Sequence, residues 1–530
     1  MGLNQPPPLV DYNVFESDRA LREALEREGA SWAHDHLHHV GEVAGGEEAI
    51  RWGFQANENP PRLRTHDRFG NRMDEVEFHP AWHELMRFAA GHGMHASPWR
   101  EPGPGAHAAR AAAFYVWSQV EGGHGCPISM TYAAVPALRA QPELAREWEP
   151  LLTSLEYDPG LRPHDQKRGV LFGMGMTERQ GGSDVRANTT RADPLGNGEY
   201  LITGQKWFLS APMCDAFLVL AQAPRGLSCF LLPRVLPDGT RNALHMQRLK
   251  DKLGNRSNAS SEVEFDGARA QLVGEEGRGV KTIIEMVNHT RLDCVIGSAS
   301  LMRQAVAQAT HHAAHRSAFG KLLADQPLMV NVLADLAIES EATTVLMMRL
   351  AASFDGGEED EHFRRLALPV AKYWCTKRAV SVAAEALECL GGNGYVEESI
   401  MPRLYREAPL NSIWEGSGNV NALDVLRAVN REPASVEAFF GALDPALGAA
   451  TGALRRELSD AGDIESRARW LVERMAILLE ASLLLRHGEP DVAGAFIGSR
   501  VEGSGRQFGT LRPSSTLRTI VERARPLIHQ

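Results

Sequence analysis

One glycine-rich stretch limits what this chain can fold into more than any other. Residues 174–184 read Met-Gly-Met-Thr-Glu-Arg-Gln-Gly-Gly-Ser-Asp, so two hydroxyls, Thr177 and Ser183, enclose a pair of glycines. Glycine accepts positive φ and lets backbone N–H groups approach a ligand without a Cβ in the way. Such a loop can turn its N–H groups and hydroxyls toward a phosphate or toward the polar edge of a flat ring. On its own, a short Gly-Gly-Ser run fits an ordinary surface turn equally well.

Two further segments place aromatic side chains beside polar ones. The dipeptide Asn197-Gly198 is a strong turn signal, and we expect it to lead into a hairpin-like segment over residues 199–210. That segment ends in Lys-Trp-Phe-Leu-Ser at residues 206–210. Much later, residues 413–419 read Ile-Trp-Glu-Gly-Ser-Gly-Asn, which sets a carboxylate between an aromatic residue and a glycine. The two segments favour a ligand-binding role for the glycine-rich loop.

Length and composition predict a large, soluble protein. A chain of 530 residues corresponds to roughly three to four domains. The net charge of −11 excludes a protein that binds polyanions through its overall charge, so a nucleic-acid site would have to be a local basic face. No apolar run approaches the roughly 20 residues that span a bilayer, and the N-terminus has no signal-peptide core. We expect a cytoplasmic protein without a membrane partner.

The cysteines and histidines do not predict a metal site. The six cysteines are scattered without a C-x-x-C pair, which favours buried thiols in a reducing compartment over disulfides or zinc. The cluster His34, His36, His38 and His39 lacks a closing set of ligands. His311 and His315 form only a single pair at helical spacing. We expect solvated, capping or structural roles for these histidines and no bound metal.

Hydrophobic periodicity divides the chain into four regions. Residues 1–170 read as mostly helical, and residues 171–275 contain short apolar runs bounded by turns, as strands do. Residues 276–430 are helical again, and residues 431–530 form a separate tail with helical periods. The sequence therefore predicts a mainly α protein with a central β domain.

Three local patterns give more detailed expectations. The acidic run at residues 358–361 predicts a solvated loop between helices. Pro369 fits the first turn of a helix, and Gly391-Gly392 should stop that helix. Residues 498–509, rich in glycine and serine, predict a long loop.

The tail carries a local excess of positive charge. From residue 500 onward, six arginines stand against two glutamates, which gives 6 − 2 = +4 on a chain whose total is −11. The arginines are Arg500, Arg506, Arg512, Arg518, Arg523 and Arg525. This is the kind of local basic face that a nucleic-acid site would need.

Taken together, these segments resemble the acyl-CoA dehydrogenase family, and within it the branch that takes part in the adaptive response to DNA alkylation. The matching segments are residues 4–8, 78–83, 126–131, 174–184, 249–260 and 390–419. The resemblance implies a helical domain, a small β-barrel domain and a four-helix bundle, with an extra C-terminal helical domain in this branch. The expected boundaries are 1–170, 171–275, 276–430 and 431–530.

The resemblance also implies FAD as the cofactor, held between the bundle and the β domain and at a subunit interface of a homotetramer. Thr177 and Ser183 stand where the family contacts the flavin or its phosphates. Phe208 and Ser210 stand where an aromatic ring and a hydroxyl cover the isoalloxazine. The cofactor set implied is Met176, Thr177, Gly182, Ser183, Phe208, Leu209, Ser210, Arg316, Phe319, Gly391, Gly392, Ile413, Trp414, Gly416 and Asn419.

Some of these residues belong to motifs that serve a neighbouring subunit. Arg316, Phe319 and Gly320 match the R-x-x-F-G motif that reaches the neighbour's FAD, and residues 390–395 match the family's L-G-G-x-G-Y loop. Glu388 and Asn419 stand where a glutamine is usual in the family. Taken singly, Phe208 and Phe319 could instead pack in a core.

Glu415 aligns with the family's catalytic base, which removes the α-proton of an acyl thioester. A carboxylate with an ordinary pKa of about 4.3 is a poor base for that step unless burial raises the pKa toward about 6–7. Trp414 and the flavin would supply an apolar wall for Glu415. The alternative is a carboxylate that only binds the flavin or caps a turn.

Two functions therefore remain open. In the first, the protein is a flavoprotein that binds double-stranded DNA without sequence readout in the alkylation response, with weak acyl-CoA dehydrogenase activity. Its DNA-facing residues would be Arg427, Arg500, Arg506, Arg512 and Arg518, of which the first two match arginines of the DNA-facing surface in that branch. In the second, it is a metabolic dehydrogenase of short or branched acyl-CoA whose tail is structural.

Overall fold

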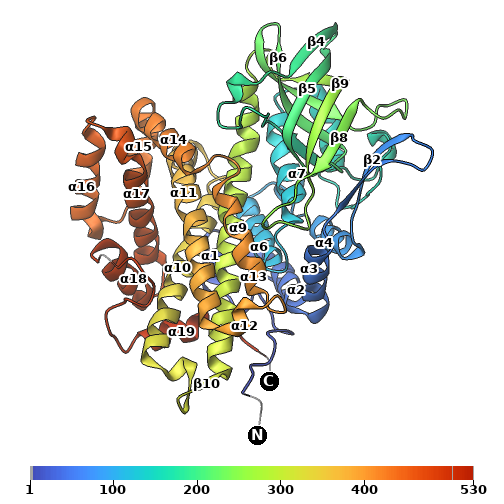
Figure 1. Ribbon diagram of the computed structural model, residues 1–530. Coiled ribbons are helices and arrows are strands. Elements are labelled where there is room, and N and C mark those ends of the chain that lie inside the picture. The colour runs from blue at the N-terminus through green and yellow to red at the C-terminus, as the bar shows by residue number, and fades with distance from the viewer. Residues whose placement is uncertain (1–3, 504, 529–530) are drawn as a thin grey trace. The chain divides into compact units, whose positions relative to one another are not determined.

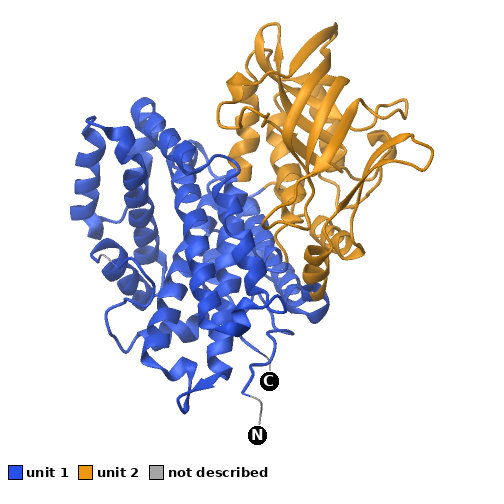
Figure 2. Cartoon of the chain, in the orientation of Figure 1, with its two compact units in different colours: residues 1–50, 103–120, 291–530 blue, residues 51–102, 121–290 orange. Residues whose placement is uncertain are grey.

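The chain folds into two compact units, each built from separate segments of the sequence (Figure 2). The computed structural model describes residues 4–503 and 505–528. Unit 1 contains residues 1–50, 103–120 and 291–530, and unit 2 contains residues 51–102 and 121–290. The four-domain division predicted from the sequence is a finer one and stays a prediction.

Unit 1 is helical (Figure 1). Its helices are α1 (Arg19–Arg27), α2 (His34–Gly45), α6 (Ala106–Ser118), α10 (Pro327–Ala352), α11 (Glu358–Cys389), α12 (Gly392–Tyr395), α13 (Met401–Glu407), α14 (Gly418–Arg431), α15 (Pro433–Gly441), α16 (Gly448–Ser459), α17 (Ile464–His487), α18 (Pro490–Phe496) and α19 (Leu517–Ala524). Helix α9 (Gly279–His315) begins in unit 2 and continues in unit 1, and α3 (Glu47–Glu58) runs from unit 1 into unit 2. A small hairpin, β10 (Ser317–Ala318) and β11 (Lys321–Leu322), follows α9.

The long helix α11 lies at the centre of this bundle and contacts α10, α14, α15 and α17. The expectation of a solvated loop at residues 358–361 is wrong, because these residues form the first turn of α11. Four carboxylates there face the positive end of the helix macrodipole, which favours negative charge. The acidic run therefore starts the helix and does not interrupt it.

Two further local expectations need correction. Pro369 lies inside α11 and not in its first turn, so the helix continues past a residue that has no N–H to donate. The loop expected at residues 498–509 begins with a short π-helical turn, Ile497–Val501, that continues α18. By contrast, α11 does end at Cys389, just before Gly391, which has a φ of +60°.

Unit 2 contains a closed β-barrel with helices beside it (Figure 1). Its seven strands are β3 (Phe172–Gly175), β4 (Arg191–Gly196), β5 (Glu199–Ser210), β6 (Ala216–Ala223), β7 (Gly226–Pro233), β8 (Leu244–Leu249) and β9 (Ser260–Val273). The strand order is β3-β5-β4-β6-β7-β9-β8, and an additional antiparallel pairing of β5 with β9 closes the sheet on itself. The turn predicted at Asn197-Gly198 joins β4 to β5, and both residues have positive φ.

The rest of unit 2 lies before the barrel in the sequence. Its helices are α4 (Pro80–Gly91), α5 (Ser97–Arg100), α7 (Gly125–Leu138) and α8 (Pro142–Leu152). A two-stranded hairpin, β1 (Arg62–His66) and β2 (Arg72–Glu77), was not predicted from the sequence. All six cysteines are buried free thiols. Among the described residues, no helix is long and apolar enough to cross a membrane.

Candidate functional site

The glycine-rich loop of unit 2 is folded tightly on itself. Glu178 and Gly181 form an antiparallel bridge across it, and Gly181 has a φ of +132°. A Cβ at Gly182 would lie 2.4 Å from the hydroxyl oxygen of Thr177, so only glycine fits there. Gly182 and Ser183 are exposed. The loop thus exposes hydroxyls and backbone N–H groups, and Gly182, which has no side chain, leaves room for the hydroxyl of Thr177.

A fully buried ion pair connects this loop to strand β5. Lys206 Nζ donates to Glu178 Oε1 at 2.8 Å and to the carbonyl of Leu220 at 2.7 Å, and neither charged side chain is exposed to solvent. The same carboxylate accepts the N–H groups of Thr189 and Thr190 at 2.7 and 3.2 Å. Burial opposes ionisation, but Lys206 and these donors outweigh it and lower the pKa of Glu178 to about 2. The loop is therefore held by an ionised carboxylate.

A β-bulge gives the end of β5 its orientation. Lys206 pairs with Val263 and Leu209 pairs with Ser261, so three steps along β5 oppose two steps along β9. A bulge of this kind redirects side chains and is common beside active sites. Leu209 is fully buried, whereas the ring of Phe208 is 44% exposed. Phe208 is therefore not a core residue, and Leu209 could contact a ligand only through its backbone.

The bulge brings aromatic rings to the glycine-rich loop. The N–H of Trp207 donates to the carbonyl of Thr177 at 2.9 Å. Lys250 Nζ lies 3.6 Å from the ring centre of Trp207 and 4.6 Å from that of Phe208. Unit 2 thus contains seven of the expected cofactor residues: Met176, Thr177, Gly182, Ser183, Phe208, Leu209 and Ser210.

The candidate residues of unit 1 centre on a strained glutamate. Glu415 has a φ of +58°, and Gly416 follows with a φ of +100°. A positive φ costs a residue with a side chain on the order of 1–3 kcal/mol, and such residues cluster at active sites. Arg291 Nε donates to the carbonyl of Glu415 at 3.1 Å, and Arg291 Nη1 is bonded to Asp424 at 2.9 Å.

Buried side chains hold the carbonyls on either side of Glu415. Lys372 Nζ donates to the carbonyls of Trp414 and Gly416 at 2.7 and 2.6 Å. Asn421 Nδ2 also donates to the Gly416 carbonyl, at 2.6 Å. Burial lowers the pKa of Lys372, whose side chain is enclosed by the bundle. Three consecutive carbonyls, at residues 414–416, thus accept hydrogen bonds from cationic side chains, and the backbone at Glu415 is fixed in its strained conformation.

The motifs expected to serve a neighbouring subunit lie on the surface of unit 1. Phe319, at the turn of the β10–β11 hairpin, is 99% exposed and has a φ of +53°. Tyr395, at the end of α12, is 80% exposed. Core packing of Phe319 is therefore excluded. The remaining residues of the set, Arg316, Gly391, Gly392, Ile413, Trp414, Gly416 and Asn419, are also in unit 1.

The five arginines expected to face DNA have different surroundings. Arg500 is 8% exposed and donates to Asp335 and Glu339 at 2.5 and 2.9 Å, so internal carboxylates satisfy its guanidinium. The other four are exposed: Arg427 and Arg518 pair with Asp424 and Asp325 at 3.3 and 3.2 Å, while no ion pair joins Arg506 or Arg512 to another described residue. Arg500 thus has a structural role.

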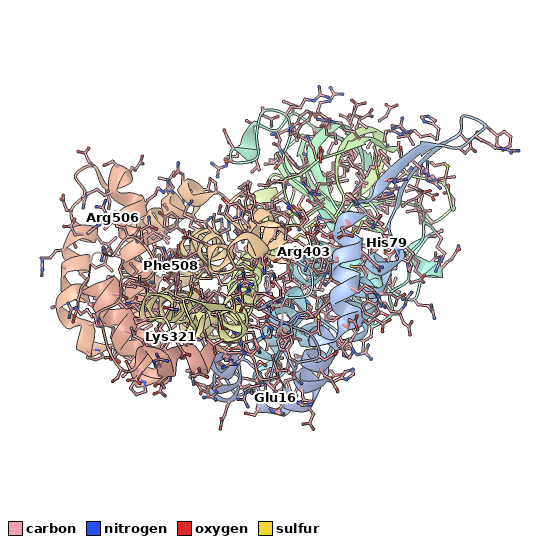
Figure 3. The ribbon with its side chains drawn as sticks, turned by 60° about the horizontal axis from the view of Figure 1, so that its bottom comes forward. Glu16, His79, Lys321, Arg403, Arg506 and Phe508 are labelled. Atoms are coloured by element: carbon pink, nitrogen blue, oxygen red, sulfur yellow. The ribbon has the colours of Figure 1, made fainter. Side chains whose placement is uncertain are left out.

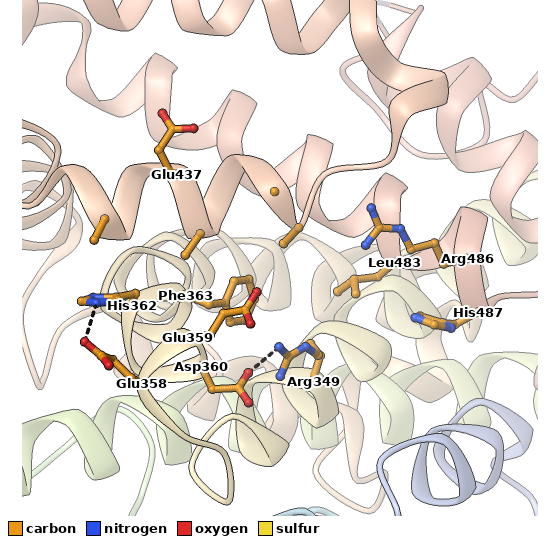
Figure 4. A pocket seen from close by; sticks show the side chains of 14 residues that line it. Arg349, Glu358, Glu359, Asp360, His362, Phe363, Glu437, Leu483, Arg486 and His487 are labelled. Carbon is orange, nitrogen blue, oxygen red and sulfur yellow. Dashed lines mark hydrogen bonds and ion pairs between the residues drawn. The ribbon is translucent and has the colours of Figure 1, made fainter.

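Unit 1 also contains a cavity of about 780 Å³ that is separate from these residues (Figure 4). It lies among the ends of α10, α11, α15 and α17 and has Phe363 and Leu483 in its wall. Carboxylates alternate there with cationic side chains, and Asp360 pairs with Arg349 at 2.5 Å. None of the candidate site residues lines this cavity, so it is not part of the site described here.

The fold corresponds to a known class of protein: the chain belongs to the acyl-CoA dehydrogenase family. Residues 173–268 match the family model of the acyl-CoA dehydrogenase middle domain, and residues 277–430 match that of the C-terminal domain. Residues 4–159 match the model described as the adaptive response protein AidB N-terminal domain. The chain is 51% identical to AidB of Escherichia coli (strain K12) over 433 residues, which cover 81% of this chain and 80% of AidB. It is 32% identical to acyl-CoA dehydrogenase family member 11 of Caenorhabditis elegans over 471 residues, 84% of this chain and 75% of that protein.

Two solved structures share the fold over at least nine-tenths of the chain. The apo form of Bd2924 matches with a TM-score of 0.85 at 29% identity, over 91% of this chain and 99% of that one. ACDH-11 of C. elegans, solved in complex with C11-CoA, matches with a TM-score of 0.86 at 27% identity, over 99% of this chain and 92% of that one. A glutaryl-CoA dehydrogenase of Mycobacterium smegmatis, solved with FADH2, shares the fold at a TM-score of 0.55 and 20% identity, over 65% of this chain and 86% of that one. The predicted mainly helical fold with a small β-barrel is confirmed.

Sequence reasoning missed the residues that hold the backbone near the candidate residues of each unit. Lys206 was seen only as part of an aromatic run, and Lys372, Arg291 and Glu178 were given no role. A signal was present for Lys372, because it is the only charged residue in the apolar run of residues 366–375. A lysine in such a run is rarely buried unless it is paired.

Proposed function

We propose that this protein binds FAD and dehydrogenates an acyl-CoA thioester, with Glu415 as the base. The observation that carries the proposal is the strained backbone at Glu415, whose carbonyl and the two beside it accept hydrogen bonds from Arg291 and Lys372. A strained conformation that several buried side chains maintain is characteristic of a catalytic residue. Family membership supports the reaction class, and C11-CoA bound to ACDH-11 supports an acyl-CoA substrate.

The donors present in unit 2 fit FAD. The exposed loop offers the hydroxyls of Thr177 and Ser183 and a cradle at Gly182 that a Cβ would fill. Phe208 offers a half-exposed ring that can cover a flat heterocycle. Hydroxyls, free N–H groups and an aromatic face are the groups that hold the phosphates and the ring of a flavin.

In the proposed reaction, Glu415 takes the α-proton of the thioester onto its carboxylate while the β-hydride departs. FAD, when bound, supplies the acceptor for that hydride. Arg291 binds the carbonyl of Glu415, and Lys372 binds the carbonyls on either side of it, so together they hold the backbone that carries the base. The acyl chain is left with a double bond between Cα and Cβ, and Glu415 is left protonated.

The substitution Glu415→Gln tests this role. It keeps the shape of the side chain and removes the base, so we expect acyl-CoA-dependent bleaching of the flavin to slow by about 10²–10⁴-fold. FAD content should stay at the wild-type level. The measurement is single-turnover flavin absorbance with short and branched acyl-CoA, and the exposed Glu398→Gln serves as the control. Retention of the wild-type rate by Glu415→Gln would show that another group is the base.

We also propose that the protein is a homotetramer. Phe319 and Tyr395 are large apolar side chains that stand almost free of their own subunit, as interface residues do. The resemblance assigns the hairpin and the loop at Gly391 to a neighbour's FAD. Analytical ultracentrifugation of the FAD-loaded protein tests the proposal, and a stable FAD-loaded monomer would contradict it.

A second function, binding of double-stranded DNA in the alkylation response, is favoured by the loop that carries Arg506 and Arg512. Reciprocal hydrogen bonds between Asn331 and Leu511, at 2.9 and 3.0 Å, fix this loop on α10. The guanidinium of Arg378 lies over the ring of Phe508, 4.8 Å from the centre of that ring. Phe508 lies in the same part of unit 1 as Arg506 (Figure 3). The loop thus offers two exposed arginines on a fixed backbone. Duplex binding by variants of these arginines tests the function.

A further inference from the structure

The N-terminal segment Asn4–Pro8 is bonded to the hairpin that follows α9 (Figure 1). Asn4 Nδ2 donates to the carbonyl of Ser317 at 2.9 Å, and the N–H of Ser317 donates to Asn4 Oδ1 at 2.9 Å. The guanidinium of Arg316 donates to the Asn4 carbonyl. Both polar atoms of the Asn4 side chain therefore bind the backbone of Ser317, the first residue of the hairpin.

The same segment reaches two other elements of unit 1. Asn393 Nδ2, in α12, donates to Gln5 Oε1 at 2.8 Å. His311 Nε2, near the end of α9, is 2.8 Å from the Pro7 carbonyl, which can only accept. The segment thus joins α9, the hairpin and α12, which are far apart in the sequence.

The joining segment is stiff and anchored at its far end. Each of its three consecutive prolines has a fixed φ and no N–H, so the segment has few conformations to lose when it binds. Leu9 and Tyr12 are buried beyond it, and the Tyr12 hydroxyl donates to Gln304 of α9 at 3.1 Å. A rigid, anchored segment can fix the position of what it touches, whereas a loose tail could not.

The elements that it joins expose apolar groups in an unfavourable setting. Phe319 has a positive φ, which is costly for a bulky residue, and it is almost wholly exposed. Tyr395 of α12 is exposed beside the Gly391 turn. Both rings are largely exposed within their own subunit, so a surface that covered them would remove apolar area from water.

We propose that residues 4–8 act as a strap that sets the positions of the β10–β11 hairpin and α12, the two elements that the proposed function assigns to the subunit interface. The inference rests on the proposed function, in which the hairpin and the loop at Gly391 serve a neighbouring subunit. The proposed function does not explain how a hairpin with only four strand residues keeps a fixed position. The strap supplies that explanation, because it binds the hairpin from outside.

Asn4→Ala removes the side-chain bonds to Ser317 but leaves the prolines and the anchor. We expect a three- to thirtyfold rise in the subunit dissociation constant by sedimentation over a concentration series, since about two hydrogen bonds are lost. FAD should be lost faster on dilution, and amide exchange of residues 316–322 should accelerate. The Tm of the subunit should change little, because Asn4 is exposed. Asn4→Asp, which keeps the acceptor for the Ser317 N–H, should restore part of the assembly.

The matched control is Asn59→Ala, because Asn59 is an exposed asparagine with one local hydrogen bond, in unit 2. If Asn4→Ala assembles and retains FAD like this control, the strap has no positioning role, while a FAD-loaded wild-type oligomer keeps the proposed function intact. A wild-type protein that is monomeric and takes up no FAD would remove the proposed function and the inference together. A loss of assembly with accelerated exchange only at residues 316–322 and α12 supports the strap.

Discussion

Two lysines show how single residues hold the backbone near candidate site residues. Lys206 in unit 2 and Lys372 in unit 1 both have buried ammonium groups that donate to backbone carbonyls. Lys372 holds the main chain on either side of Glu415, and Lys206 connects β5, the strand that carries Phe208, to Leu220 of β6 and to Glu178 of the glycine-rich loop. Sequence reasoning found Phe208 and Glu415, because sequence motifs consist mainly of residues that contact a ligand. It missed the lysines, because a lysine in a strand or a helix is usually solvated.

Removing only one charge of the buried pair Lys206–Glu178 should strongly destabilise the fold. Lys206→Met leaves an uncompensated carboxylate, and we expect a loss of about 3–5 kcal/mol in the free energy of unfolding. The double variant Lys206→Met/Glu178→Gln should recover much of that loss, because no unpaired charge remains. Urea unfolding measures both values. The surface pair of Arg139 and Glu149 is the control, and Arg139→Gln should cost about 0–1 kcal/mol. An equal loss in the single and the double variant would contradict the role of charge pairing.

At the scale of elements, the C-terminal helices are attached to the bundle by charge as well as by apolar packing. The π-helical turn Ile497–Val501 directs Arg500 between Asp335 and Glu339 of α10. Arg378 of α11 donates to the same Glu339 at 2.6 Å. The sequence predicted helices and a loop here but not the π turn, because its role depends on carboxylates that lie far away in the sequence. It also misassigned the acidic start of α11, where local charge was read as solvation.

Acid should weaken this attachment. Burial opposes ionisation of Glu339, but Arg378 and Arg500 outweigh it and lower the pKa of the carboxyl to about 2. The folded-state pKa is below the ordinary value of 4.5, so the stabilisation is complete above about pH 4.5 and is lost as the pH falls toward 2. The shift corresponds to about 3 kcal/mol. We expect the free energy of unfolding to fall over this range in the wild type and to fall less in Glu339→Gln. Parallel pH profiles for the two proteins would exclude this carboxyl as the cause.

At the scale of the whole molecule, the resemblance predicted the fold class, and the site residues that it implies in the two units stay a prediction. The grouping into two units was beyond sequence reasoning, because residues 51–102 join the barrel through long-range contacts such as those of Arg234 with the backbone at Asp74. The net charge of the tail follows from the sequence, but the sequence did not show which of the arginines are exposed and which are paired with carboxylates. Arg500 and Arg523 pair with carboxylates inside unit 1, so the excess on the surface comes from fewer arginines than the sequence count implies.

This distribution determines how DNA binding should depend on salt. In a chain of net charge −11, attraction to duplex DNA must come from a local face, here Arg506, Arg512 and Arg518. Each phosphate that is neutralised releases counterions, so the logarithm of affinity should fall with the logarithm of salt concentration, with a slope of about −0.9 per phosphate. Arg506→Gln/Arg512→Gln should flatten that slope by about 1.8 per subunit engaged and leave FAD content unchanged. Affinity should differ little between duplex sequences, because phosphate contacts carry no sequence information. Fluorescence anisotropy from low to physiological salt measures the slope, with the exposed Arg191→Gln as control. If the double variant keeps the wild-type slope, or if the wild type binds no duplex at low salt, these arginines do not contact DNA and the dehydrogenase function stands alone.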